Sequence, residues 1–194
     1  MKDKTKRNLI IFMVLAALLI GLALIAPHLT INDPYATNSA AMKLGPCKEY
    51  PFGTDKMGRC VFSRVMMGAR TSIFCSLLLV AITFVTGTIL GVFCGYYGGI
   101  ADTVIMRLAD VLLAFPQMVL AIAVAGILGG SMVNAMIALG ISGWTVYARL
   151  AKSQVLMLKE EEFIKAAKMG GCSALYIMMF HILPNIGGPL IVNA

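Results

Sequence analysis

Charge-free apolar runs set the strongest limit on what this chain can fold into. One run of 19 residues extends from Asn8 to Ala26, and another of 38 residues extends from Val111 to Ala148. An α-helix needs about 20 predominantly apolar residues to cross the hydrocarbon core of a bilayer. The first run therefore predicts one membrane-spanning helix, and the second is long enough for two.

The composition agrees with a membrane protein. Hydrophobic residues make up 59% of the 194 residues and charged residues 13%, whereas soluble domains are about 45–50% apolar and about 25% charged. A soluble fold of this mass leaves too much surface exposed to bury that apolar share. This excludes a soluble enzyme, a disordered tail and a disulfide-rich secreted module, and it predicts the all-α class, as a polytopic helical membrane protein.

The excess of basic residues indicates how the chain is oriented. The net charge of +7 comes from 16 Lys and Arg against 9 Asp and Glu, and many basic residues flank the apolar runs. Lys and Arg concentrate in cytoplasmic loops, so the four basic groups within residues 1–7 predict a cytoplasmic N-terminus. A cleaved signal peptide is the alternative for the first run; Leu24 and Pro27, near the position of a cleavage site, argue against it.

Alternation of polar and apolar stretches divides the chain into five segments. In order, they are a cytoplasmic tail with the first transmembrane helix (1–27), an extracytoplasmic loop (28–70), a transmembrane core (71–148), a cytoplasmic loop (149–185) and the start of a fifth transmembrane helix (186–194). Within the core we expect three helices, over about 72–98, 105–128 and 132–148. Nine residues cannot span a bilayer, so we expect the fold to be incomplete at the C-terminus.

Three glycines recur at a spacing of four residues in the second predicted helix. Gly87, Gly91 and Gly95 lie on one face of a helix, and small residues at this spacing let two helix backbones approach closely in a membrane. We interpret this face as a packing surface.

Charged and proline residues mark the third predicted helix. Arg107 and Asp110 are three residues apart and can pair along one helix face. Charges within a membrane are costly, so this pair either anchors the helix at the interface or belongs to a pathway. Pro116 removes a backbone hydrogen bond and predicts a kink, which is either structural or part of a translocation path.

The cytoplasmic loop carries the most informative pattern. Three glutamates at 160–162 stand where a helix would begin, which suits its dipole. Lys165-Ala166-Ala167 follow, Gly170-Gly171 predict a turn, and an apolar helical stretch runs to a proline stop at Pro184. We interpret this segment as a protruding helix–turn–helix whose small alanines let a partner dock; an ordinary cytoplasmic loop is the alternative.

The sequence offers no motif for catalysis. It contains no Gly-x4-Gly-Lys-Ser/Thr phosphate loop and no HExxH zinc motif, and its two histidines, His28 and His181, fall in different regions. We therefore assign no catalytic, cofactor-binding or metal-binding residue and expect that the chain is not an enzyme. The cysteines form no CxxC pair, and a disulfide between Cys47 and Cys60 stays an open alternative.

Several of these motifs resemble one protein family. Lys165-Ala166-Ala167, Gly171 and Leu183-Pro184 are similar to the EAA signature of ABC importer permeases, which reads E-A-A, three residues, G, nine residues, I-x-L-P. Lys165 replaces the usual Glu, and His181 replaces the usual Ile. The lead-in at Glu162 and the Leu-Pro-Asn ending resemble the dipeptide, oligopeptide and nickel branch of these permeases.

The resemblance extends over nearly the whole chain. Residues 52–59 resemble the stretch that these permeases carry before their second span, with Cys60 where they usually have Asp. Further matching positions follow in order: Ser63-Arg64, Gly68-Ala69-Arg70, Asp102, Arg107, Asp110, Ala114-Phe115-Pro116 and Tyr147-Ala148-Arg149.

This resemblance implies a MetI-like permease fold and a place in the bacterial inner membrane. It implies a DppC-like or NikC-like subunit that pairs with a DppB-like second permease subunit, two cytoplasmic ABC ATPase subunits and an extracytoplasmic substrate-binding protein. The family continues through a fifth and a sixth span, so we expect this chain to be C-terminally truncated. The residues implied in coupling to the ATPase are Glu162, Lys165, Ala166, Ala167, Gly171, Leu183 and Pro184.

Import of di- or oligopeptides is the function that the resemblance favours, and nickel or nickel-chelate import is the alternative within the family. An ion-coupled secondary transporter would need ion ligands within the membrane and, usually, inverted repeats, and we find no internal repeat in the sequence. A membrane scaffold without transport activity would explain the glycine face but not the helix–turn–helix.

Overall fold

The computed structural model describes residues 2–193, and the side chains of residues 7–193. These residues form helices joined by turns and loops, with one isolated antiparallel bridge between Thr54 and Cys60. The predicted all-α class is confirmed. The chain divides into two compact units between Leu77 and Leu78.

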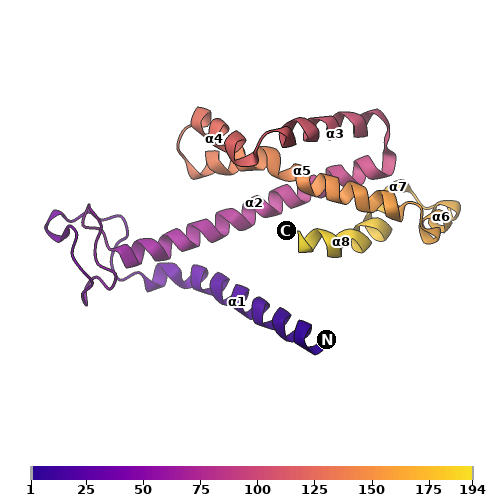
Figure 1. Ribbon diagram of the computed structural model, residues 1–194. Helices are drawn as coiled ribbons and strands as arrows, with labels where there is room; N and C mark the ends of the chain where they lie inside the picture. Colours follow the sequence, from indigo (N-terminus) through magenta and orange to yellow (C-terminus); the bar gives the residue numbers. More distant parts are fainter. Residues whose placement is uncertain (1, 194) are drawn as a thin grey trace. The chain divides into compact units, whose positions relative to one another are not determined.

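The first unit contains helix α1 (Lys2–Leu29), a polar loop and the first part of helix α2 (Val61–Tyr97), as Figure 1 shows. The loop includes the short 3₁₀ turn η1 (Ser39–Ala41), whose N-cap Asn38 accepts a hydrogen bond from the Ala40 main-chain nitrogen. Such a side-chain cap satisfies an N–H group that the turn itself leaves unbonded.

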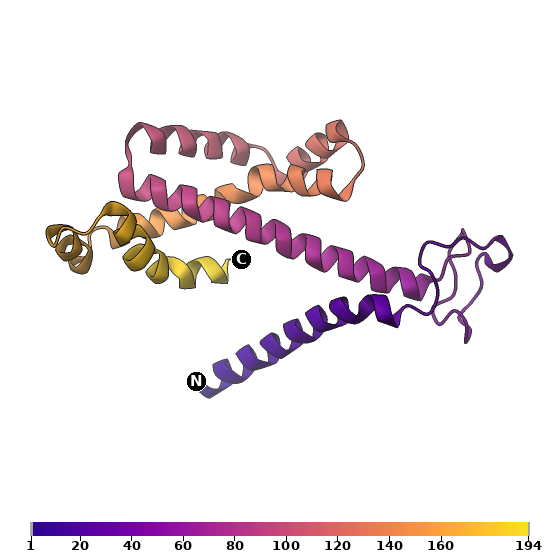
Figure 2. The ribbon, with the colours of Figure 1, turned by 180° about the vertical axis from the view of Figure 1, so that it is seen from behind.

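The second unit contains the rest of α2 and all later helices, seen from behind in Figure 2. A turn at Gly98 and Gly99, with φ of 66° and 73°, reverses the chain after α2 in a conformation that favours glycine. The helices that follow are α3 (Gly99–Ala114), α4 (Gln117–Leu128), α5 (Met132–Leu158), α6 (Glu162–Met169), α7 (Ala174–Tyr176), the π-helical turn η2 (Ile177–Ile182) and α8 (Leu183–Val192).

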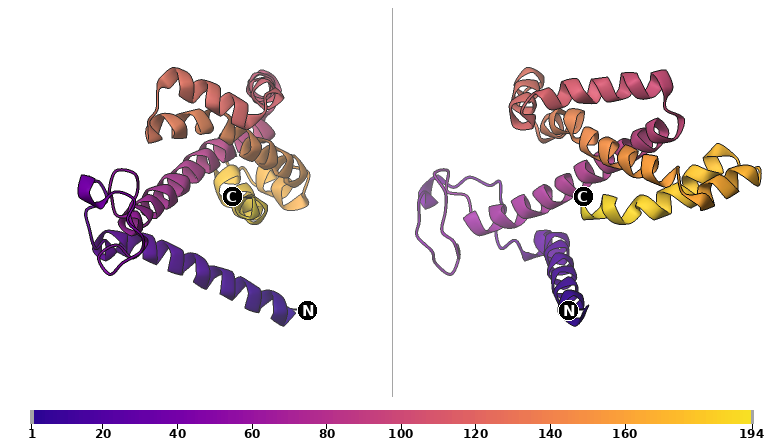
Figure 3. Two further views of the ribbon diagram at one scale, coloured as in Figure 1. Left: turned by 60° about the vertical axis from the view of Figure 1, so that its left-hand side comes forward. Right: turned by 45° about the vertical axis from the view of Figure 1, so that its right-hand side comes forward.

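Helix α5 is the centre of the second unit. Helix α4 folds back on its first part and α3 lies beside its second part (Figure 3), and α8 also contacts it. Small and polar residues such as Ala148, Ser142 and Thr145 are buried on α5. A helix covered by protein does not need an apolar side chain at every position.

Length and composition identify the helices that can cross a membrane. Among the described residues, three helices qualify on their own, over Arg7–Leu29, Val61–Tyr97 and Ala174–Val192. Helices α3 and α4 together make a fourth candidate, bent by 90°. Helix α5, where the sequence predicts a span over 132–148, is outside this set because polar residues and glycine interrupt its apolar side chains.

The third predicted helix, 105–128, differs from the structure. Instead of one kinked helix there are two, α3 and α4, separated at Phe115 and Pro116. Phe115 is extended (φ −94°, ψ 139°), as the residue before a proline tends to be. Pro116 therefore ends one helix and serves as the N-cap of the next.

The helix boundaries on either side of the loops differ as well. Helix α2 begins at Val61, so residues 61–70, assigned to the extracytoplasmic loop, continue the second span without a break. Helix α5 continues past 148 to Leu158. Both predicted ends were set by charged residues, which helices tolerate when the charged groups reach water or an ionic partner.

The C-terminal helix begins earlier than the sequence predicts. The apolar helical stretch starts at Ala174, not at 186, and passes through Pro184. A π-helical turn precedes that proline, which lies in the first turn of α8, where the missing N–H costs no helical hydrogen bond. The expectation that Pro184 stops the helix was wrong.

Candidate functional site

Helix α6 is a short, separate helix between α5 and the C-terminal helical stretch. Glu162 lies in its first turn and Lys168 in its last, an arrangement that complements the helix dipole. Lys165 Nζ lies 3.3 Å from Glu160 Oε2, an exposed ion pair. Exposed pairs contribute little stability, so tertiary packing must hold α6 in place.

One side chain provides most of that packing. Ile164 is fully buried in an apolar cluster with Val155 of α5 and Ile177 and Ile182 of η2. Burying one Ile side chain contributes roughly 1.5–3 kcal/mol. Ile164 is therefore the fully buried residue through which α6 packs on the rest of the second unit.

The opposite side of α6 is open. Phe163 is 44% exposed and Met169 is 84% exposed, and Ala166 is exposed between them in sequence. Apolar side chains left exposed on a short helix outside the predicted spans are typical of a protein-interaction surface. We call Phe163, Ala166 and Met169 the open face of α6.

The two alanines of the signature have different environments. Ala166 is exposed, whereas Ala167 is half-buried and packs against the apolar cluster around Ile164. The sequence motif predicts that both alanines are docking residues. The structure places only Ala166 where a partner could reach it without moving α6.

A glycine turn follows α6. The Gly170 nitrogen donates to the Ala166 carbonyl (2.8 Å), and the Cys172 nitrogen donates to the Ala167 carbonyl (3.1 Å). Gly171 has φ of 80°, a conformation that side-chain-bearing residues rarely adopt. This explains why the pattern needs glycine at 171. Leu183 and Pro184, at the far end of the signature, lie at the start of α8.

The glycine face of α2 packs directly on α5. A Cβ atom at Gly87 would lie 2.4 Å from the Trp144 carbonyl oxygen, and one at Gly91 would lie 2.3 Å from the Ala148 carbonyl oxygen. At Gly95 the nearest atom, 2.7 Å away, is Val155 Cβ. The two backbones are therefore in close contact at Gly87 and Gly91, and the Val155 side chain packs against Gly95.

Ion pairs join α3 to α5. Asp110 pairs with Arg149, and Asp102 Oδ1 lies 2.5 Å from Lys152 Nζ. The predicted pairing of Asp110 with Arg107 is therefore wrong, and Arg107 is exposed. Arg149 and Lys152 lie one turn apart on α5, a spacing that could have indicated a basic stripe facing another helix.

Tyr96, which the sequence analysis did not single out, contacts the segment around α6. Lys159 Nζ donates a hydrogen bond to the Tyr96 carbonyl oxygen (2.9 Å), and Lys168 Nζ lies 5.2 Å from the centre of the Tyr96 ring. Lys159 precedes α6 in sequence, and Lys168 lies in its last turn. An aromatic residue at the end of a span ordinarily indicates only an interfacial anchor.

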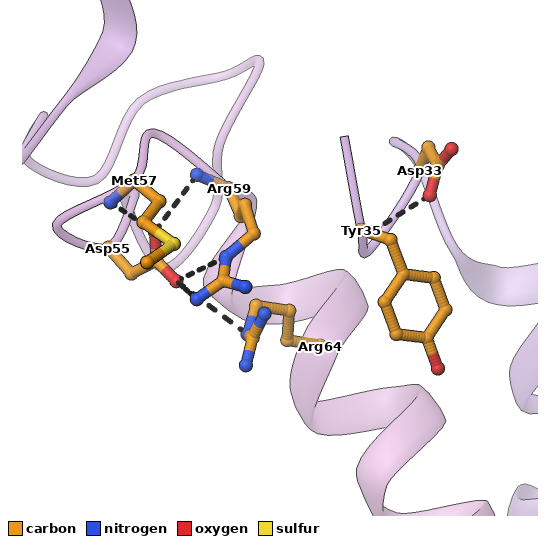
Figure 4. A network of polar contacts seen from close by, with 6 residues as sticks. All are labelled: Asp33, Tyr35, Asp55, Met57, Arg59 and Arg64. Atoms are coloured by element: carbon orange, nitrogen blue, oxygen red, sulfur yellow. Dashed lines mark hydrogen bonds and ion pairs between the residues drawn. The ribbon is translucent and has the colours of Figure 1, made fainter. Parts of the chain in front are cut away.

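In the first unit, Asp55 organises the polar loop (Figure 4). Its carboxylate accepts hydrogen bonds from the main-chain nitrogens of Met57 (2.8 Å) and Arg59 (3.1 Å) and from Arg59 Nε (2.8 Å). Desolvation opposes ionisation, but these hydrogen bonds and the Arg59 charge outweigh it and lower the pKa of Asp55 to about 2. The Asp-Lys-Met-Gly-Arg sequence, part of the stretch that resembles the permease family, thus has a structural role.

Within residues 7–193, no three His, Cys, Asp or Glu side chains cluster closely enough to hold a metal ion. Cys47 and Cys60 are not joined; Cys47 is exposed and Cys60 is buried.

Residues 87–194 match the protein family described as "Binding-protein-dependent transport system inner membrane component". The chain belongs to this family. With its apolar helices, it is a multi-pass membrane protein. The matched region includes the glycine face, α5, α6 and the C-terminal helices.

Curated relatives show the same relationship over nearly the full chain. The dipeptide transport system permease protein DppC of Alkalihalophilus pseudofirmus is 41% identical over 98% of this chain and 63% of the relative. The probable D,D-dipeptide transport system permease protein DdpC of Escherichia coli is 40% identical over 93% and 61%. The oligopeptide transport system permease protein OppC of Bacillus subtilis is 32% identical over 100% and 63%. The chain thus spans less than two thirds of the length of these relatives.

Proposed function

We propose that this chain is a permease subunit of an ATP-driven importer for di- or oligopeptides. It forms part of the translocation pathway in the bacterial inner membrane, with its N-terminus in the cytoplasm. Its partners are a DppB-like second permease subunit, two cytoplasmic ABC ATPase subunits and an extracytoplasmic substrate-binding protein. The names of the relatives support the peptide substrate.

The open face of α6 is the observation that carries this proposal. An eight-residue helix held by one buried isoleucine leaves Phe163, Ala166 and Met169 accessible. In the proposal this face binds a groove of an ATPase subunit. Closure of the ATPase pair on ATP then moves α6 and, through α5 and η2, the transmembrane helices.

The remaining matched residues have supporting roles in the proposal. Gly171 permits the turn that returns the chain behind α6, and Leu183 and Pro184 lie at the start of α8, after α7 and η2. Asp110 keeps α3 beside α5 through Arg149. Pro116 separates α3 from α4, and we propose that the bend lies beside the translocation path, with Arg107 at its boundary.

Substitution of Ala166 tests the proposal. Ala166→Glu adds a bulky charge to the open face without touching the chain's own apolar cluster, and Ala166→Ser is the matched small, neutral control. We expect Ala166→Glu to abolish copurification of the ATPase subunits and peptide uptake, while Ala166→Ser and membrane insertion of both variants stay as in the wild type. ATPase binding that survives Ala166→Glu would contradict docking on this face.

The ligand of the cognate substrate-binding protein tests the substrate. Mass spectrometry of that protein, purified with its native ligand, should detect short peptides. Bound nickel without peptide would favour the alternative within the family. A wild-type chain that copurifies with no ATPase and transports with an ion gradient would instead indicate a secondary transporter.

A further inference from the structure

Tyr96 lies in the last turn of α2, 63 residues before Lys159 in the sequence, yet it contacts the segment around α6. The tyrosine is half-buried and packs against the same apolar cluster that holds Ile164. Two lysines reach it from opposite ends of α6. Lys159 precedes the helix, and Lys168 lies in its last turn.

The two lysines bind different parts of Tyr96. Lys159 Nζ donates to the main-chain carbonyl (2.9 Å), one of the four carbonyls at a helix C-terminus that have no partner within the helix. Lys168 Nζ lies over the ring, 5.2 Å from its centre, and Lys159 Nζ is 6.0 Å from the same centre. A cation within about 6 Å of an aromatic face is attracted by the ring quadrupole. We call Tyr96, Lys159 and Lys168 the Tyr96 clasp.

The clasp joins α6 to α2, a helix that is not its neighbour along the chain. Helix α6 is connected to α5 through residues 159–161 and to η2 through Ile164. Apart from the clasp, the link between α6 and α2 is the shared apolar cluster, in which Ile164 of α6 and Val92 of α2 are both buried. With the clasp, Lys168 of α6 and Lys159, the C-cap residue of α5, both contact the end of α2.

We propose that the Tyr96 clasp transmits movement of α6 directly to α2. Tyr96 and Lys168 are then positioning residues for coupling between ATP hydrolysis and import. This role rests on the proposed function, in which α6 binds the ATPase. It adds a second route for that movement, beside the one through α5.

Amide hydrogen exchange of the chain in lipid nanodiscs tests the clasp without any partner. Tyr96→Leu removes the ring face and keeps an apolar side chain, whereas Tyr96→Phe keeps the face; Lys168→Gln and Lys168→Arg form the second matched pair. We expect amides of α6 to exchange about two- to five-fold faster in Tyr96→Leu and Lys168→Gln, the ratio that an exposed cation–π contact supplies. The Phe and Arg variants should match the wild type. Unchanged exchange in Tyr96→Leu would overturn the clasp.

The complete transporter, with its ATPase subunits and substrate-binding protein, tests the coupling role. We expect Tyr96→Leu and Lys168→Gln to copurify with the ATPase as the wild type does, but to hydrolyse more ATP per peptide imported. The Phe and Arg variants should restore the wild-type ratio. Faster exchange of α6 with an unchanged ratio would overturn the coupling role. Failure of the wild-type chain to bind any ATPase would overturn the proposed function, and the coupling role with it.

Discussion

The polar loop 30–60 and the α6 loop, 159–173, both connect apolar helices, yet their side chains find partners in different places. In the polar loop, Asp55, Thr54 and Asn32 bond to groups of the same loop. In the α6 loop, Phe163 and Met169 have their apolar surfaces exposed. The polar loop also exposes apolar side chains, such as Phe52 and Met57. The difference is therefore that its polar groups bond within the loop, whereas the exposed apolar side chains of the α6 loop lie on one face of a short helix.

The largest expected difference between the two loops is their accessibility from the two sides of the membrane. Cys47 in the polar loop and Cys172 in the α6 loop are both exposed. Because we place the loops on opposite sides, a membrane-impermeant maleimide added to intact cells should label Cys47 and leave Cys172 unlabelled. After permeabilisation both should react, with Cys47→Ser and Cys172→Ser as controls. Labelling of both in intact cells would contradict the orientation.

A glycine substitution should open the polar loop. Gly58 has φ of 71°, and a Cβ there would lie 1.8 Å from the Asn38 carbonyl oxygen. Backbone strain and overpacking together predict a cost of about 2–6 kcal/mol for Gly58→Val. Trypsin should then cleave the loop at its lysines much faster. Gly45→Val is the control, because nothing lies within 4 Å of its Cβ position; equal cleavage of the two variants would contradict this packing.

Truncation of Ile164 should release α6. Ile164→Ala removes the fully buried side chain of that helix, and a cavity of this kind costs about 2–5 kcal/mol. We expect fast hydrogen exchange throughout α6 while α5 keeps its protection. Phe163→Ala, on the open face, is the matched control and should leave exchange unchanged. Protection of α6 in Ile164→Ala would show that other contacts hold it.

Acid should affect the polar loop within a narrow pH range. The pKa of Asp55 falls from 3.8 to about 2 on folding, so its carboxylate stabilises the loop above the unfolded pKa. This contribution decreases below pH 3.8 and is lost as pH falls through about 2. Exchange of the Met57 and Arg59 amides, corrected for the intrinsic effect of pH, should rise over this range in the wild type. Exchange in Asp55→Asn should show no such pH dependence. If the pH dependence persists in this variant, a group other than Asp55 causes it.

The sequence predicted features that depend on local spacing. The four-residue spacing of Gly87, Gly91 and Gly95 predicted a face for close helix contact, and these glycines contact α5 in the structure. Pro116 predicted a kink within one helix, whereas the structure has two helices bent by 90° at this point, a bend that depends on how α4 packs on α5. The membrane class followed from composition, because the cost of exposing apolar surface does not depend on the fold.

Features that depend on distant parts of the chain were missed. Asp110 pairs with Arg149, 39 residues away, and an argument from helix spacing could only offer Arg107. Tyr96 meets lysines that lie far along the chain, and Ala167, unlike Ala166, packs against an apolar cluster built from several helices. Such pairings arise from the packing of whole helices, which a spacing argument does not contain.

The direct backbone contact between α2 and α5 has a mechanical consequence. Helices separated by long side chains can slide past each other when those side chains change rotamer. At Gly87 and Gly91 no such side chains lie between the helices, because the α5 carbonyls occupy the space that a Cβ would take. Sliding would drive these backbones into each other, so α2 and α5 should tilt through a transport cycle as one rigid body, with displacement taken up at the joints on either side of the pair.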